Sequence, residues 1–184
     1  MTKPARLLLG SALLASFVLL ASCRSAPSSL PELRPLASVD LPRFMGDWYV
    51  IAHIPSFLEK GAYNAVESYR LAADGSIATT FTFNQDSPDG PLKTYHPKGI
   101  VRNAGSNSEW AMQLMWPLQA DYAIVYLDQD YQQTIVARQQ RDYVWIMART
   151  PQISPADYEA LSERVRKMGY QTNLLRKIPH TTQR

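Results

Sequence analysis

The side chains that most often carry catalysis or bind metals are sparse and scattered in this chain. Its three histidines are His53, His96 and His180, and neither an H-x-x-x-H pair nor a paired-cysteine spacing accompanies them. Isolated histidines do not support a metal site, because such sites need several ligands at short, regular spacings. The G-x-S-x-G turn that exposes a catalytic serine is also absent. We therefore expect no catalytic residue, no metal site and no cofactor.

The single cysteine, Cys23, lies where covalent lipid attachment is the expected chemistry. Lys3 and Arg6 precede an apolar run over residues 7–20, and small residues stand directly before the cysteine, as in an export signal. The letters Leu-Ala-Ser-Cys at residues 20–23 resemble the bacterial lipobox, in which the signal is removed and the cysteine is acylated. An ordinary signal peptide, with Cys23 incidental, is the alternative interpretation.

Acylation would anchor the protein, because two or three fatty chains hold stably in a membrane whereas one chain does not. The apolar run is too short for a comfortable span of about 20 residues. Arg24 stands where an aspartate would signal retention in the inner membrane. We therefore expect a signal peptide at residues 1–22, a lipidated tether at residues 23–40, and a location on the outer membrane facing the periplasm.

The charge of the mature chain excludes no small ligand but gives no support for nucleic-acid binding. The 19 basic and 16 acidic residues of the full chain give a net charge of +3. Loss of Lys3 and Arg6 with the signal lowers this to about +1. The basic residues near the C-terminus lack interleaved aromatic side chains, so we expect no nucleic-acid partner. No cysteine remains for a disulfide, and about 160 residues suit one domain with a packed core.

Short β-rich runs separated by turn residues occupy most of the remaining chain. Asp74-Gly75 is a strong hairpin signal. Eight runs at this spacing, without intervening helices, predict an antiparallel meander closed into a barrel. The eight runs are residues 48–54, 65–71, 77–83, 94–102, 110–116, 122–127, 134–138 and 143–149.

One helix is well signalled near the C-terminus. Ser154 is a plausible N-cap, Pro155 fits the first helical position, and Gly169 suits the position after the helix. Tyr158, Leu161, Val165 and Met168 would then share one apolar face. Residues 170–175 are expected to add a short ninth strand.

A glycine and a tryptophan at the start of the first strand are matched by an arginine about a hundred residues later. Gly46 allows a tight chain entry, and strand alternation places Trp48, Val50 and Ala52 on one face. Arg149 ends the last strand, where a guanidinium stacked on the indole would be favourable. G-x-W alone is a weak signal, but the pair resembles the lipocalins, in which the tryptophan and arginine close the bottom of a barrel.

The segments at residues 46–55, 122–136 and 142–151 are most similar to the lipocalin branch that contains bacterial outer-membrane lipocalins and apolipoprotein D. The resemblance implies an all-β lipocalin domain over residues 41–178. Its fold would be an eight-stranded antiparallel up-and-down barrel with one C-terminal α-helix packed on its wall, followed by a tail at residues 179–184.

A barrel of eight strands can enclose one small ligand. The resemblance and the position of Arg149 indicate which side chains face inward. The expected ligand-binding residues are Glu67, Tyr69, Thr79, Phe81, Tyr122, Ile124, Tyr126, Tyr143 and Trp145. Tyrosine hydroxyl groups would contact a polar head group while the rings line an acyl chain. A core filled by these aromatic side chains, with no cavity, is the alternative.

Two orientations stay open. In residues 110–116, periodicity favours Trp110, Met112, Leu114 and Trp116 as one apolar face, whereas the resemblance puts the intervening residues inside. Glu67 faces either the lumen or solvent. If it lies in the lumen without a partner, burial should raise its pKa, disfavour anionic fatty acids and favour a zwitterionic head group.

These features together predict a membrane-anchored lipid carrier rather than an enzyme. The expected partners are a small amphiphilic lipid and, through acyl chains on Cys23, the membrane; monomer and homodimer are both compatible. The main alternative is an envelope scaffold with a filled barrel whose open-end loops, with Phe57 and Leu58, bind another protein. An enzyme acting on a lipid is a more distant alternative.

Overall fold

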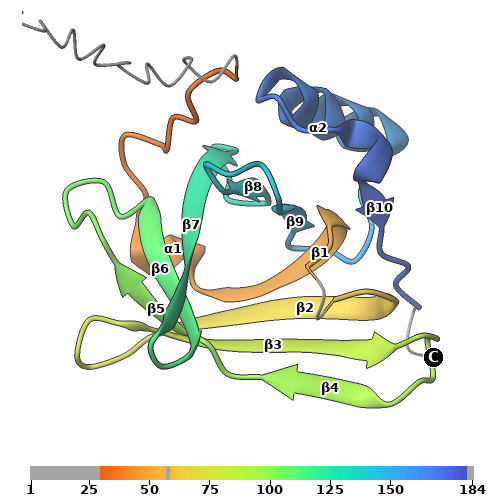
Figure 1. Ribbon diagram of the computed structural model, residues 1–184, viewed down its shortest axis with the longest axis horizontal. Coiled ribbons are helices and arrows are strands. Elements are labelled where there is room, and N and C mark those ends of the chain that lie inside the picture. The colour runs from red at the N-terminus through yellow and green to blue at the C-terminus, as the bar shows by residue number, and fades with distance from the viewer. Residues whose placement is uncertain (1–29, 57–58, 182–184) are drawn as a thin grey trace, which may run out of the picture.

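The computed structural model describes residues 30–56 and 59–181. The expected signal peptide, Cys23, Phe57 and Leu58 lie outside the described residues. Within them, antiparallel strands close into an eight-stranded barrel, and one C-terminal helix lies on its wall (Figure 1). The predicted fold class is confirmed.

The strands are β1 (Gly46–Ile54), β2 (Ala62–Leu71), β3 (Ile77–Gln85), β4 (Leu92–Tyr95), β5 (Lys98–Val101), β6 (Glu109–Met115), β7 (Leu118–Leu127), β8 (Gln133–Ala137), β9 (Val144–Ala148) and β10 (Arg176–Lys177). The helices are α1 (Leu41–Phe44) and α2 (Pro155–Lys167), with a 3₁₀ turn at Thr172–Leu174.

The barrel closes because β9 pairs back onto β1. The strand predicted at residues 94–102 is split into β4 and β5, which both pair with β3 and together make the fourth barrel strand. The interruption falls at His96 and Pro97. A proline has no backbone N–H to donate to a sheet, so it favours a break at this point.

The C-terminal segment completes the wall between β1 and β2. These two strands pair only over residues 46–49 of β1, and β10 pairs with β1 farther along, at Ala52 and His53. The ninth strand predicted at residues 170–175 is therefore misplaced by a few residues. Residues 179–181, expected to be a tail, also bond to the barrel, because Asn64 N donates to Pro179 O at 3.0 Å.

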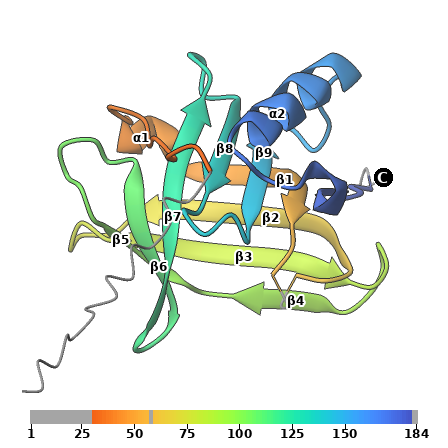
Figure 2. The same cartoon turned by 45° about the horizontal axis from the view of Figure 1, so that its top comes forward.

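The helix α2 begins and ends as its sequence predicts. Ser154 Oγ accepts from Asp157 N at 3.0 Å, and Gly169 adopts a φ of +89° directly after the helix C-cap. Leu161 and Val165 are buried against the barrel wall. Figure 2 shows α2 lying over β8 and β9.

Two apolar layers result from this arrangement. One fills the closed end of the barrel around Phe44, Trp48 and Trp110. The other lies between α2 and the outer faces of β1, β8 and β9, and it includes Ile135 and Ile146. Strands with both faces buried lose the alternation of apolar and polar residues, which is why residues 135–137 of β8 and all of β9 are apolar.

A β-bulge in β1 reverses the face on which its last residues lie. The pairing register between β1 and β9 shifts between Val50 and Ala52. A bulge adds one residue to one strand, so the following side chains change face. The prediction that Ala52 shares the inner face of Trp48 is therefore wrong: Ala52 packs in the layer under α2.

The segment before α1 is part of the barrel rather than a tether. Leu33 and Val39 are buried, and Leu36 N donates to Ile124 O at 2.9 Å. Ser108 Oγ in turn donates to Leu36 O at 2.7 Å. The expected tether at residues 23–40 is thus wrong for residues 33–40, which we call the N-terminal arm.

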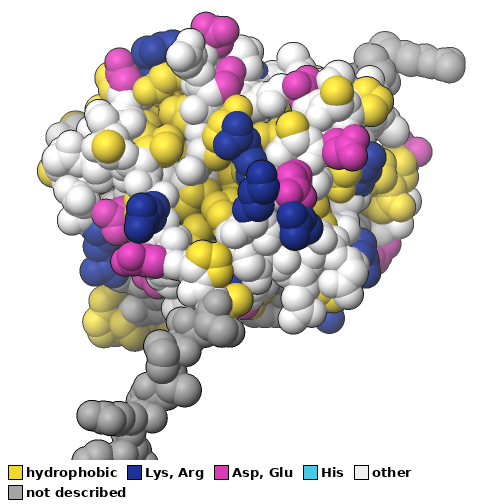
Figure 3. Space-filling view, turned by 90° about the horizontal axis from the view of Figure 1, so that it is seen from above, with side chains coloured by type: hydrophobic (Ala, Val, Ile, Leu, Met, Phe, Trp, Pro, Cys, Tyr) yellow, Lys and Arg dark blue, Asp and Glu magenta, His cyan; other side chains and the backbone are white. Residues whose placement is uncertain are grey.

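The face on the α2 side carries charged side chains of both signs, scattered among apolar ones (Figure 3). Over residues 30–56 and 59–181, no helix combines the length and apolar character needed to cross a membrane.

Candidate functional site

The closed end of the barrel is held by Arg149 and Trp48. The guanidinium of Arg149 lies 3.8 Å from the centroid of the Trp48 ring, the stack expected from the sequence. Its nitrogens also donate to the backbone carbonyl groups of Arg43, Phe44, Met45, Asp47 and Tyr131. Trp48 Nε1 donates to Phe44 O at 2.8 Å. One arginine therefore ties α1, β1 and the β7–β8 loop together.

Gly46 makes this contact possible. Its φ is +97°, in the region that favours glycine, and a Cβ there would lie 3.3 Å from Arg149 Nη1. A side chain at this position would press on the guanidinium. The Gly46-x-Trp48 motif thus serves the floor of the barrel, beneath the candidate site.

Above this floor the barrel contains a mostly apolar cavity of about 230 Å³. Its walls come from β2, β3, β4, β6, β7, β9 and the β1–β2 loop. The lining residues are Ser56, Glu59, Glu67, Tyr69, Phe81, Tyr95, Pro97, Met112, Leu114, Ala120, Tyr122, Tyr143, Trp145 and Met147. Six of the nine expected ligand-binding residues are among them: Glu67, Tyr69, Phe81, Tyr122, Tyr143 and Trp145.

Tyr69 and Tyr122 line the cavity, and Trp110 of the closed-end core packs behind them. The hydroxyl groups of Tyr69 and Tyr122 lie 2.6 Å apart and share a hydrogen bond. Tyr122 stacks on Trp110 with 4.9 Å between ring centroids and an interplanar angle of 4°. Burial raises the pKa of both tyrosines well above its ordinary value. Each hydroxyl therefore stays neutral and available for hydrogen bonding.

Glu67 lies in the lumen, which decides one of the open orientations. It faces the cavity from β2, between Trp48 on β1 and Phe81 on β3 in the strand register. Among the described residues, Glu67 Oε2 has no hydrogen-bond partner and no exposure to solvent. Burial raises the pKa of Glu67 to about 8, the charge of Glu59 adds to this shift, and the Tyr69 hydroxyl opposes it.

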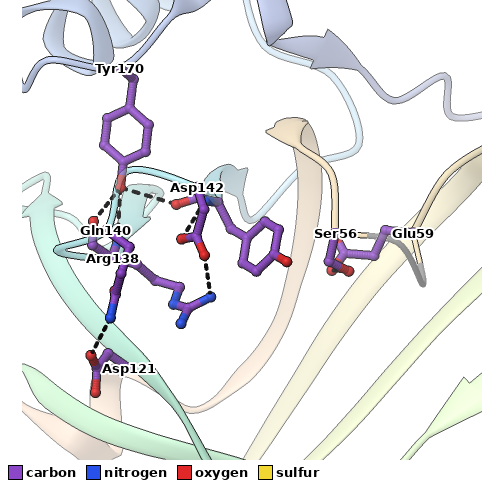
Figure 4. Close-up of polar contacts among 8 residues, drawn as sticks. Ser56, Glu59, Asp121, Arg138, Gln140, Asp142 and Tyr170 are labelled. Atoms are coloured by element: carbon purple, nitrogen blue, oxygen red, sulfur yellow. Dashed lines mark hydrogen bonds and ion pairs between the residues drawn. The ribbon is translucent and has the colours of Figure 1, made fainter.

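A second carboxyl group, Glu59, stands at the cavity rim in the β1–β2 loop. Its Oε2 accepts from Trp145 Nε1 at 3.0 Å and lies 2.8 Å from His53 Nδ1. Its Oε1 accepts from Ser56 Oγ at 2.9 Å, and Figure 4 shows the two side chains together. The buried His53 is thus satisfied within the protein. Sequence reasoning missed Glu59, because a loop residue carries no periodicity that reveals its direction.

Three expected ligand-binding residues do not line the cavity. Tyr126 lies on the outer face, where Arg164 of α2 stacks 4.3 Å from its ring centroid, so its inward prediction is wrong. A bulge between Ile124 and Tyr126 in the β7–β8 pairing reverses the alternation. Ile124 is buried in the closed-end core, and Thr79 is buried without contributing to the cavity lining.

The second open orientation concerned which residues of β6 face inward. Three of the four residues that periodicity favoured do face inward. Trp110 lies in the closed-end core, and Met112 and Leu114 line the cavity. Trp116 does not follow them, because it lies at the tip of the β6–β7 hairpin and 82% of it is exposed. Met115 and Leu118 are exposed beside it. These exposed side chains make the hairpin tip an apolar patch at the open end of the barrel.

The β8–β9 loop forms another part of the rim and is fixed by polar contacts (Figure 4). Arg138 pairs with Asp142 at 2.9 Å. The hydroxyl of Tyr170 donates to Arg138 O, 2.9 Å away, or Tyr143 O, 3.0 Å away, and accepts from Arg138 N at 2.9 Å. These bonds hold the loop that carries Tyr143 onto the cavity.

A closed barrel with a packed floor, a rim of loops and an apolar cavity between them defines the class of single-domain barrels that enclose one small molecule. The chain belongs to the lipocalin family. A family model described as a lipocalin-like domain matches residues 39–180. The family consists of proteins that bind small hydrophobic molecules and are generally not enzymes.

Individual relatives agree with this assignment. The chain is similar to temperature-induced lipocalin-1 of Arabidopsis thaliana, with 29% identity over 82% of this chain and 84% of the relative. It is also similar to outer membrane lipoprotein Blc of Vibrio cholerae, with 24% identity over 86% and 91%. Insecticyanin of Manduca sexta shares the fold, with a TM-score of 0.65 at 13% identity over 85% and 88%. The predicted lipocalin resemblance is confirmed.

Proposed function

We propose that this lipocalin binds one small amphiphile, such as a fatty acid or a lysophospholipid, and carries or stores it at the bacterial cell envelope. The observation that carries the proposal is the cavity of about 230 Å³, whose walls are mostly aromatic and aliphatic. Apolar walls with a few polar groups are typical of sites for small molecules. The volume is slightly below the usual range of about 300–1,000 Å³, so a long ligand would extend through the rim.

The location at the envelope is proposed from the N-terminal sequence and from the relatives. Cys23 follows a basic and apolar leader, as a lipid attachment site would. Bacterial relatives carry the name outer membrane lipoprotein. Acyl chains on Cys23 would hold the barrel at the outer membrane, where released lipids are available to the cavity.

The alternative of a scaffold with a filled barrel has less support. Aromatic side chains do fill the closed end around Trp48 and Trp110, but the space between Phe81, Tyr122 and Trp145 is not filled by protein. Protein interiors rarely leave such space empty without a function. The cavity therefore favours a carrier.

Ligand binding can be tested with paired substitutions inside and outside the barrel. Phe81→Ala removes a ring that lines the cavity, so we expect amphiphile binding to weaken by about 1–3 kcal/mol. Tyr126→Ala removes an aromatic ring of similar size from the outer face, so binding should be unchanged. Calorimetric titration of delipidated Cys23→Ser protein with laurate and with a lysophospholipid measures both effects.

Native mass spectrometry of the same samples gives the stoichiometry, which should be one amphiphile per chain. A protein that stays empty with every lipid class would contradict the carrier function. Equal weakening by both substitutions would show that binding does not take place in the cavity.

A further inference from the structure

The carboxyl group of Glu67 is an unusual component of the cavity wall. It stands on β2 among Phe81, Tyr69 and Tyr122, and nothing in the floor of the barrel requires a carboxyl group at this position. Buried carboxyl groups are normally paired with a cation or fully hydrogen-bonded. Glu67 Oε2 has neither kind of partner among the described residues.

The groups around Glu67 compensate its carboxyl group only in part. The hydroxyl groups of Tyr69 and Tyr122 share one hydrogen bond at 2.6 Å, and the Tyr69 hydroxyl opposes the rise in the pKa of Glu67 without cancelling it. Glu59, the other acid of the cavity, is occupied by His53, Ser56 and Trp145. No lysine, arginine or histidine is found among the residues that line the cavity in the described part of the chain.

This environment favours the protonated acid over the carboxylate. Burial raises the pKa of Glu67 to about 8, and the nearby Glu59 contributes in the same direction. A protonated carboxyl group has one O–H donor. Near neutral pH, Glu67 therefore presents a hydrogen-bond donor to a site whose walls are mostly apolar.

We infer that Glu67 determines ligand specificity by donating a hydrogen bond to an uncharged oxygen acceptor at the buried end of the ligand, such as an ester, amide or ketone carbonyl. The inference rests on the proposed carrier function and names the class of ligand for the same cavity. An apolar molecule without such an acceptor leaves the donor unsatisfied, which disfavours its binding.

A ligand carboxylate fits the buried end less well than an ester. At that depth it would meet Glu67, and the residues described as lining the cavity include no cation. Like charges at short range in a poorly solvated site disfavour ionisation. A fatty acid would therefore place its carboxylate at the rim, whereas an ester could enter with its carbonyl group towards Glu67.

The test compares ligands of similar chain length that differ in their polar group. Delipidated Cys23→Ser protein is loaded with the hydrocarbon dye diphenylhexatriene, which is displaced by methyl decanoate, by the hydrocarbon undecane or by decanoate. At pH 6 we expect methyl decanoate to bind more tightly than undecane by about fivefold to tenfold, the effect of one hydrogen bond. Glu67→Leu should abolish this preference while the dye still binds.

Glu67→Gln is the matched control, because its amide keeps a donor but cannot ionise. It should retain the preference for the ester at both pH 6 and pH 9. The wild-type preference should fall at pH 9, where Glu67 becomes a carboxylate that cannot donate. Tyr69 and Tyr122 stay protonated over this range, because burial raises their pKa values.

Each result has a defined meaning. An ester preference that survives in Glu67→Leu, or that does not change with pH in the wild-type protein, would overturn the role of Glu67 while leaving the carrier function intact. Failure of the wild-type protein to bind both the dye and the ester would overturn the carrier function and this inference with it.

Discussion

Arg149 satisfies five backbone carbonyl groups and one indole face with a single planar group. Lysine could not replace it, because an ammonium group has three donors and no flat face to lie on Trp48. The guanidinium donates to carbonyl groups at the end of α1, because the last carbonyl groups of a helix have no hydrogen-bond partner within the helix. At the scale of single residues, the floor of the barrel therefore depends on arginine, because only its side chain has enough N–H donors for these carbonyl groups.

A double-mutant cycle measures this contact. Trp48→Ala should destabilise the protein by about 3–5 kcal/mol, because it empties a fully buried site. Arg149→Ala should cost less, and the double mutant should lose less than the sum of the two, since each single change already breaks the stack. Urea unfolding of the three variants gives the values; strict additivity would mean that the two side chains do not interact.

The raised pKa of Glu67 also predicts how stability depends on pH. The folded state holds the proton up to about pH 8, whereas an unfolded glutamate loses it near its ordinary value of 4.5. Stability should therefore fall as pH rises between these two values, at about 1.4 kcal/mol for each pH unit in which only the folded state is protonated.

Urea unfolding of the wild-type protein and of Glu67→Gln at pH 5 and pH 8 separates this effect from other titrating groups. The wild-type protein should lose a few kcal/mol more than the variant over this interval. Parallel pH profiles for the two proteins would place Glu67 in contact with solvent.

At the scale of elements, the N-terminal arm and the bulges decide the shape of the wall. Leu36 of the arm is hydrogen-bonded to β7, and the side chain of Leu33 is buried. The bulges move Ala52 and Tyr126 to the layer beneath α2. A segment without regular secondary structure therefore contributes buried side chains to the barrel, as Leu33 and Val39 show.

Leu33, the first residue of the arm, and Leu30, just before the arm, test this packing. Leu33 is 3% exposed, so Leu33→Ala should destabilise the domain by about 2–5 kcal/mol. Leu30 is 43% exposed, and Leu30→Ala should change stability by less than about 1 kcal/mol. Thermal unfolding of both variants makes the comparison. Equal, small losses would indicate that residues 33–40 are a free tether after all.

At the scale of the whole molecule, the arm shortens the distance between the barrel and its proposed anchor. Only six residues lie between Cys23 and Leu30. Even fully extended, the chain from Cys23 to Leu30 could span no more than about 25 Å. If Cys23 is acylated, the barrel is held close to the membrane surface rather than on a long linker.

The anchor itself is tested by replacing the cysteine. Cys23→Ser should leave the membrane fraction, because acyl chains are the one stable attachment that the N-terminal sequence offers. Metabolic labelling with palmitate should mark the wild-type protein and not the variant. A wild-type protein that takes up no label and remains in the soluble periplasmic fraction would contradict the lipoprotein assignment.

The sequence by itself determined the strands, the C-terminal helix and the pair of Trp48 and Arg149. Alternation, turn residues and caps act over a few neighbouring positions, so they can be recognised without knowing the partners. Ser154, Pro155 and Gly169 accordingly mark the ends of α2. The inward faces of β2 and β3 were indicated by the lipocalin resemblance, and that resemblance left the side of Glu67 open.

Only the tertiary structure decided the composition of the cavity. A bulge depends on how two strands are registered, so neither Ala52 nor Tyr126 reveals its face from its own neighbours. Glu59 reaches the rim because closure of the barrel brings its loop to His53 and Trp145. The pKa of Glu67 follows in turn from burial and from Glu59, because desolvation and charge act through space between segments that are distant in the chain.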